Sequence, residues 1–254
     1  MVDWQELTLF IYVTARMSGF VLFNPLLGRY SLPGIFRAGL VLILSVCAAP
    51  FASVPAAVPT VLFELVLKIL LELAIGYLAG LLMHIFFYIP ILAGEVIDTQ
   101  MGMAMAKTYD AGSQTSSTVL AVFLNLMMNL LFFAANGHHT LLRILITSGE
   151  LVPYGTITLG ENVISLILEL FIECTLLAVK LSLPILGAQL MSQAGMGILM
   201  KAIPQINIFA INIELKIIIG LALVYVLITP FSEFLLEVEM DMLMQIRRLL
   251  LLAQ

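Results

Sequence analysis

Charged residues are scarce in this sequence. Only 11% of its 254 residues are Asp, Glu, Lys or Arg, whereas 62% are hydrophobic. Ordinary soluble domains carry about 25% charged residues, and a soluble chain this apolar would expose very large hydrophobic patches. The same composition excludes intrinsic disorder. What remains is a polytopic membrane protein, or a subunit that its partners cover on most sides.

Basic residues and cysteines are also few. Eleven Lys and Arg against 16 Asp and Glu give a formal net charge of −5, which leaves no basic face for nucleic acid. Cys47 and Cys174 both lie in apolar stretches, where each is expected to act as a small hydrophobic residue. The first residues, MVDWQELTLF, carry two acids and no base. They are not expected to be a cleaved secretory signal.

Sequence motifs of catalysis and metal binding are missing. There is no phosphate-binding loop, nucleophile elbow or cysteine–histidine cluster. His138 and His139 are adjacent, so their side chains point apart and do not make a ready metal site. Tyr109–Asp110 resembles half of the intramembrane aspartyl protease signature, but a second, glycine-flanked aspartate is missing. We therefore expect no enzymatic activity, no cofactor and no metal.

Long apolar stretches dominate what is present. There are six, at residues 7–23, 36–57, 61–92, 119–135, 163–190 and 206–228. None alternates like a strand, and stretches of this length in lipid are helical. Pro90 and Pro184 lie near the ends of two of them, and each either kinks its helix or ends it. The C-terminal FSEFLLEVEMDMLMQIRRLLLLAQ is typical of an amphipathic helix.

Two sets of charged residues occur at helical spacing within the apolar stretches. Their members are Glu64, Lys68, Glu72, Glu169, Glu173 and Lys180. Charges at membrane depth are costly unless they are paired or hydrated. The first set, at 64, 68 and 72, forms either an ion or proton path or, as we favour, a paired stripe that holds the helix against its neighbours. We interpret the second set, at 169, 173 and 180, as buried pairs or subunit contacts in preference to a catalytic set. Gly76 and Gly80 support the paired stripe, because small residues four apart let helices pack closely.

The polar insert at residues 94–118 is the most informative stretch. Its notable residues are Glu95, Asp98, Met101, Gly102, Met103, Met105, Lys107, Asp110 and Gly112. Polar, glycine-broken backbone at membrane depth must line a cavity or be covered by protein, and flexible methionines suit closure against changing surfaces. The residues alone leave two interpretations open, a plug or pore-lining loop and an ordinary exposed loop between spans.

Several stretches together resemble the FliR/SctT family of type III export-gate proteins. They are GEVIDTQMGMAMAKTYD at 94–110, NGHHTLL at 136–142, LPILGAQL at 183–190, GMGILMKAIPQINIF at 195–209 and ELKIIIGL at 214–221. The similarity runs over nearly the whole chain, and the stretch at 195–209 is the most specific. Where the family often has Asn-Arg before Ala-Pro-Gln, this chain has Met-Lys followed by Ala-Ile-Pro-Gln.

This resemblance implies an all-α polytopic membrane protein with about six long hydrophobic helices, several of them kinked. The helices would form hairpins within a helical hetero-oligomer. Residues 1–160 would be a FliP-like part whose insert supplies an inner plug, and residues 161–254 a FliQ-like hairpin with an amphipathic tail. The turn or interface of that hairpin would use Gly195, Gly197, Lys201, Pro204, Gln205, Asn207 and Phe209.

The implied function is that of a flagellar export-gate subunit through which unfolded flagellar proteins are secreted. The expected partners are FliP and FliQ homologues, FlhA and FlhB homologues, the exported chains and membrane lipid. The expected place is the bacterial inner membrane, at the flagellar basal body. Two alternatives stay open: a virulence-type injectisome subunit, and a secondary transporter or channel that uses the broken helices and the charges at 64, 68 and 72.

Overall fold

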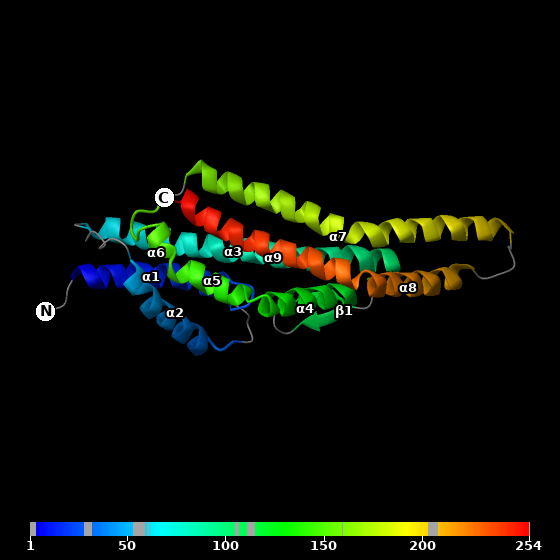
Figure 1. The fold of residues 1–254 in the computed structure, drawn as a ribbon, viewed down its shortest axis with the longest axis horizontal. Helices are drawn as coiled ribbons and strands as arrows, with labels where there is room; N and C mark the ends of the chain where they lie inside the picture. The colour runs from blue at the N-terminus through cyan, green and yellow to red at the C-terminus, as the bar shows by residue number, and fades with distance from the viewer. Residues whose placement is uncertain are drawn as a thin grey trace. The chain divides into compact units, whose positions relative to one another are not determined.

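Figure 1 shows the helices and strands of the chain in a computed structural model. The chain divides into two compact units. The structure describes residues 4–27, 32–52, 59, 61–104, 107–110, 115–158, 160–202 and 208–253. Unit 1 comprises Met1–Phe86, Asn136–Phe171 and Glu239–Gln254, and unit 2 comprises Phe87–Ala135 and Ile172–Val238. Each unit draws on both halves of the chain, so this division differs from the predicted one at residue 160. The FliP-like and FliQ-like parts remain predictions.

The described residues are almost entirely helical, as predicted. The helices that lie wholly in unit 1 are α1 (Trp4–Phe23), α2 (Gly34–Ala48) with the short 3₁₀ helix η1 (Ala49–Phe51), α5 (Gly137–Ile146) and α6 (Ser148–Leu151). Helices α4 (Val119–Ala134) and α8 (Ile208–Val226) belong to unit 2, and both units share α3 (Leu62–Met101), α7 (Glu161–Ala202) and α9 (Ile228–Leu252). Two short strands, β1 (Lys107–Asp110) and β2 (Thr115–Thr118), were not predicted.

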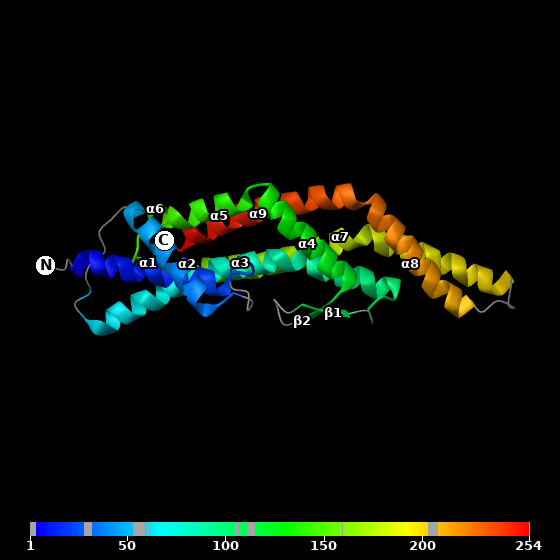
Figure 2. The same cartoon turned by 90° about the horizontal axis from the view of Figure 1, so that it is seen from below.

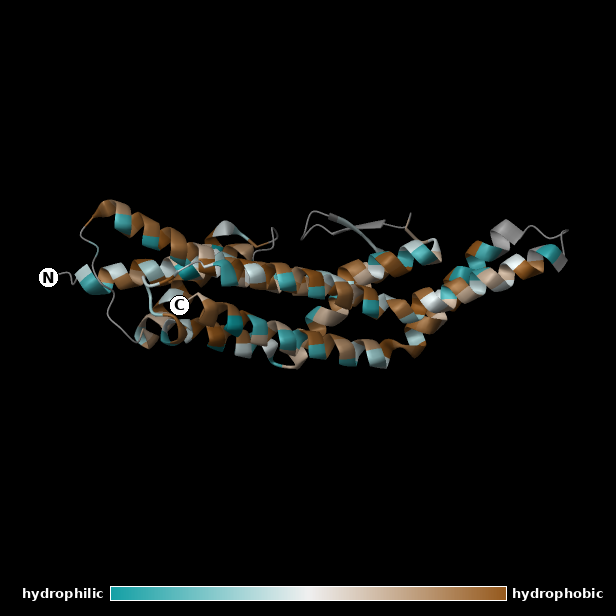
Figure 3. Ribbon diagram, turned by 90° about the horizontal axis from the view of Figure 1, so that it is seen from above, coloured by the Kyte–Doolittle hydropathy of each residue, from teal (hydrophilic) through white to brown (hydrophobic). Residues whose placement is uncertain are grey.

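The described helices suffice for a polytopic membrane protein. Four are long and apolar enough to cross a membrane, and up to six spans result if α4 with α5 and α8 with α9 each count as one broken span. Figure 3 shows hydrophobic residues along most of the helical length, with polar residues scattered among them. The predicted fold class is thus confirmed.

Helices α3 and α7 each continue past a proline. From the sequence alone, each of these prolines could have ended its helix or kinked it. Pro90 lies inside the 40-residue α3, and Pro184 lies inside the 42-residue α7. At 1.5 Å per residue each helix follows a path of about 60 Å, roughly twice the hydrocarbon thickness of a bilayer. The prediction that the polar insert begins at residue 94 was wrong, because α3 continues to Met101. The non-helical part of the insert begins only at Gly102.

Glycines bring α1 and the first half of α3 into backbone contact within unit 1. A Cβ added to Gly76 would collide with the carbonyl oxygen of Arg16, and one added to Gly19 would collide with that of Leu73. Gly80 faces the backbone of Phe23. The two helices cross in Figure 2, with α1 in dark blue and the start of α3 in cyan. The predicted close packing at Gly76 and Gly80 is confirmed.

A β-hairpin joins α3 to α4 within unit 2. Strands β1 and β2 pair antiparallel, with Lys107 opposite Thr118 and Asp110 opposite Thr115. Helix α8 then bends by 62° into α9. Pro230 in the first turn of α9 explains this bend, because its ring excludes the carbonyl four residues earlier and it has no N–H to donate.

Candidate functional site

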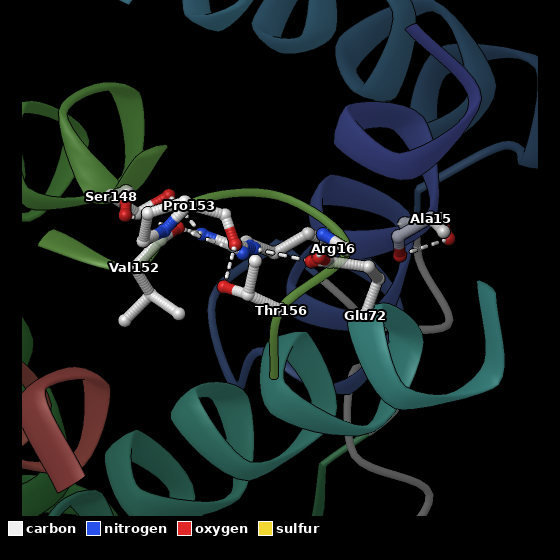
Figure 4. Close-up of polar contacts among 9 residues, drawn as sticks. Ala15, Arg16, Glu72, Ser148, Val152, Pro153 and Thr156 are labelled. Carbon is white, nitrogen blue, oxygen red and sulfur yellow. Dashed lines mark hydrogen bonds and ion pairs between the residues drawn. The ribbon is translucent and has the colours of Figure 1, made fainter. Parts of the chain in front are cut away.

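Arg16 of α1 is the centre of a buried polar cluster in unit 1 (Figure 4). Only 2% of its surface is exposed. Its Nε donates to Oε2 of Glu72 at 2.7 Å, in an ion pair between α1 and α3. Its Nη1 donates to the carbonyl and hydroxyl oxygens of Ser148, and both Nη atoms donate to the carbonyl oxygen of Val152, all at 3.2 Å. The planar guanidinium on α1 thus binds two segments that are distant in sequence, α3 at Glu72 and the segment at residues 148–152.

Glu72 has a hydrogen-bond donor on each carboxylate oxygen. While Oε2 accepts from Arg16, Oε1 accepts from the backbone N–H of Gly155 at 2.7 Å. Gly155 has a φ of +82°, a conformation that favours glycine, and its Cα lies against the ring of Tyr12. A Cβ here would be strained and would crowd that ring. The carboxylate therefore fixes the segment between α6 and α7 onto α3.

Tyr154 covers the open face of the guanidinium. The Cζ of Arg16 lies 4.1 Å from the centre of the tyrosine ring, in a cation–π contact. Burial raises the pKa of the Tyr154 phenol, and nearby Arg16 opposes that rise. The phenol is therefore neutral at physiological pH. We call the following residues the Arg16 cluster: Arg16, Glu72, Ser148, Val152, Tyr154 and Gly155.

The charged set at the start of α3 divides into two pairs. Glu64 and Lys68 pair with each other at 2.8 Å, one helical turn apart and partly exposed. Glu72 is fully buried and pairs with Arg16 instead. The favoured interpretation, paired charges between packed helices, agrees with the contacts of Glu72.

Helix α3 ends at Gly102 in a glycine cap. The N–H of Gly102 donates to Thr99, the N–H of Met103 donates to Asp98, and Gly102 has a φ of +81°. This pattern is a Schellman motif, which satisfies the last carbonyls of a helix. Gly102 therefore ends α3 at the start of the insert.

Asp98 connects the two helices that flank the insert. Its carboxylate is 1% exposed, and Oδ2 accepts from the N–H of Leu120 in the first turn of α4 at 2.8 Å. A carboxylate at this place accepts a hydrogen bond from a backbone N–H that has no partner within the helix, and it is stabilised by the positive end of the helix dipole. One turn earlier, a Cβ on Gly94 would collide with the backbone of Ala121. We call Gly94, Asp98, Leu120 and Ala121 the insert base.

The methionines of the insert differ in their surroundings. Met101 is 1% exposed and packs within unit 2, whereas Met103 is partly exposed. Met105 and Gly112 lie outside the described residues. Lys107 and Asp110 are the end residues of β1, and Glu95 is partly exposed on α3. The plug or pore-lining role of these residues stays a prediction.

The second charged set lies on the exposed surface of α7. Glu169, Glu173 and Lys180 are all exposed, and no ion pair joins them in the described part of the chain. Their assembly role stays a prediction. So does any interface role of Gly195 and Gly197, which lie inside α7 with open space around them.

The predicted hairpin turn has to lie after the end of α7. The sequence suggested that Gly195 and Gly197 lie at this turn. Helix α7 instead continues through both glycines to Ala202. Lys201 is exposed in its last turn. Pro204, Gln205 and Asn207 lie outside the described residues, and Phe209 is in the first turn of α8.

Sequence reasoning missed Arg16 and all its partners except Glu72. A lone arginine in the first apolar stretch was an available signal, because a charge at that depth requires a partner. Its partners Ser148 and Val152 contribute mainly backbone carbonyls. Such contacts leave no pattern in the sequence.

Buried charges, kinked apolar helices and a polar hairpin between two of them define a polytopic helical membrane protein with internal polar contacts. The model of the family "Bacterial export proteins, family 1" matches residues 7–241. The chain belongs to this family.

Three relatives that share one name illustrate the similarity. The flagellar biosynthetic protein FliR of Escherichia coli (strain K12) is 29% identical over 244 residues, which cover 94% of this chain and 93% of that protein. FliR of Buchnera aphidicola subsp. Acyrthosiphon pisum is 31% identical over 188 residues, or 73% of each chain. FliR of Aquifex aeolicus is 26% identical and covers 81% of this chain.

Proposed function

We propose that this chain is the FliR subunit of a flagellar protein export gate in the bacterial inner membrane, at the basal body. It assembles with FliP and FliQ homologues beside FlhA and FlhB homologues, and unfolded flagellar proteins pass through the gate. The family match over residues 7–241 carries the proposal, together with relatives named flagellar biosynthetic protein FliR.

The geometry of α3 and α7 supports a subunit of a larger assembly. Each helix is about twice as long as a bilayer core is thick. Helix α7 also exposes large hydrophobic residues and charged residues side by side, such as Phe171 and Leu176 beside Glu173. Charges at membrane depth are expensive in lipid. Neighbouring protein that covers both kinds of side chain removes this cost.

The insert is suited to a plug. Both of its ends are attached to helices, through the cap at Gly102 and the hydrogen bond between Asp98 and Leu120. Between them lies a polar two-stranded hairpin, and an isolated hairpin of this size is marginally stable. A segment with firm ends and a weak middle can close a path at rest and yield to an arriving chain, without any bond being made or broken.

Genetic replacement and purification test the proposal together. Deleting the gene is expected to abolish swimming and the secretion of flagellar proteins, and a plasmid copy restores both. The tagged chain is expected to copurify with FliP and FliQ homologues and to aggregate when expressed alone. Normal flagella in the deletion strain, or a monodisperse lone protein that binds a small solute, would contradict the proposal.

A further inference from the structure

Gly220 leaves a notch in α8 that the side chain of Met101 fills. A Cβ at position 220 would lie 2.6 Å from Sδ and 2.7 Å from Cγ of Met101. These separations are well inside van der Waals contact, so any larger residue at position 220 has to displace the methionine. Both residues are buried. A flexible thioether suits such an irregular space.

A hydrogen bond one turn before Gly220 joins α8 to α7. The amide Nε2 of the fully buried Gln189 donates to the backbone carbonyl of Lys216 at 2.8 Å. Lys216 lies one turn before Gly220, so the notch belongs to a helix that a side chain of α7 already holds. A movement of α8 relative to α7 would change this bond and the contact with Met101 together.

Met101 is also the last residue of α3 before the insert. The next residue is the glycine cap, and Asp98 one turn earlier holds the start of α4. Met101 therefore touches α8 with its side chain while its backbone leads directly into the insert. It is the described residue best placed to connect the two.

We propose that the seating of Met101 in the Gly220 notch is a latch, which holds the insert in its resting position and couples it to the pair of helices α7 and α8. A partner that shifts α8 would release the insert through this contact. By linkage, a chain that opens the insert would loosen α8 to the same extent. The gating consequence rests on the proposed function of the insert as a plug, whereas the mechanical coupling does not.

The test is the exchange of backbone amides in residues 102–118, measured by mass spectrometry on the assembled complex. Gly220→Leu is expected to speed this exchange about tenfold or more, because Met101 loses its seat and the insert opens more often. Gly187→Leu is the matched control, since a Cβ at this helical glycine of α7 meets nothing within 4 Å. The control is expected to leave the exchange unchanged.

A compensating variant separates the latch from general damage. Met101→Ala combined with Gly220→Leu exchanges the sizes of the two residues: position 101 becomes small and position 220 becomes large. This pair is expected to exchange within about threefold of the wild type. Gly220→Ala is a milder single variant if Gly220→Leu does not assemble, and its exchange is expected to rise by a smaller factor.

Ion leakage through the assembled gate is measured in the same variants. Faster exchange with increased conductance supports both the latch and the plug. Faster exchange without leakage supports the latch and contradicts the plug. Unchanged exchange in both Gly220 variants, or a double variant that exchanges as fast as Gly220→Leu, would overturn the latch.

Discussion

The Arg16 cluster of unit 1 and the insert base of unit 2 both join helices, but by different means. In the Arg16 cluster, both oxygens of Glu72 have donors, and the guanidinium has acceptors on α3 and on the segment at residues 148–152. In the insert base, Asp98 uses Oδ2, while its buried Oδ1 has no hydrogen-bond partner among the described residues. The ion pair of the first junction has hydrogen bonds at both partners, whereas the carboxylate of the second has one at a single oxygen.

This difference indicates which junction is able to move. Breaking a buried, fully bonded ion pair leaves an uncompensated charge, which is strongly destabilising. A junction that depends on one capping bond and on close packing loses much less when it opens. We therefore interpret the Arg16 cluster as fixed architecture and the insert base as the place where a gate can yield.

Removing one member of the buried pair is expected to have the largest effect. Arg16→Met leaves the Glu72 carboxylate buried without its cation, at a cost of about 3–5 kcal/mol. The measurement is the yield and thermal unfolding of the purified complex. The double variant Arg16→Met with Glu72→Leu is expected to recover part of the loss, because an apolar pair needs no partner. A double variant as unstable as the single one would contradict this account of the cluster.

A methyl group on Gly76 is expected to rank second. Its Cβ would collide with the backbone carbonyl of Arg16, which cannot move aside as a side chain can. Gly76→Ala should therefore cost about 2 kcal/mol, after allowing for the better helix propensity of alanine. Gly39→Ala in α2 is the control, because a Cβ there meets nothing within 4 Å. An equal melting temperature for both variants would show that the close approach of α1 and α3 at Gly76 contributes nothing to the stability of the complex.

Losing the carboxylate of Asp98 is expected to have an intermediate effect. Asp98→Ala removes the cap of α4, which is worth about 1–2 kcal/mol. Asp98→Asn keeps an acceptor oxygen and should lose less than half as much. Hydrogen exchange at the Leu120 amide measures the loss directly. Glu95→Ala is the control one turn away, and protection of Leu120 unchanged in Asp98→Ala would exclude the cap.

Most of the helical fold could be predicted from the sequence. Long apolar stretches without alternation leave helix as the main solution in lipid, and the small residues at Gly76 and Gly80 indicated a real contact. The ends of α3 and α7 could not be predicted as well. Proline and glycine stop isolated helices, but tertiary contacts and the apolar environment carry these helices past Pro90, Pro184 and Gly195.

The polar sites were less predictable than the helices. By sequence alone, helical spacing makes Lys68 the partner of Glu72. Only the crossing of α1 and α3 at Gly76 brings Arg16 within 2.7 Å. The hairpin within the insert had a weak signal, in that KTYD and TSST contain strand-favouring Thr and Tyr.

The smallest expected effect concerns the exposed pair on α3, and it sharpens the contrast with Glu72. Glu64 and Lys68 are 46% and 24% exposed in their side chains, and such a pair contributes about 0.3–0.5 kcal/mol in water. A double-mutant cycle with Glu64→Gln and Lys68→Met is expected to give a coupling of this size, which falls further between 0.05 and 0.5 M salt as screening increases. If the start of α3 is instead covered by a partner or by lipid in the assembled gate, solvent ions cannot reach the pair. The coupling would then exceed about 1 kcal/mol and be insensitive to salt, because a pair away from water is screened much less. The cycle measured on the complex thus distinguishes two cases. Either Glu64 stays exposed while Glu72 is buried, as in the single chain, or both carboxylates of α3 are buried beside a cation in the assembled gate.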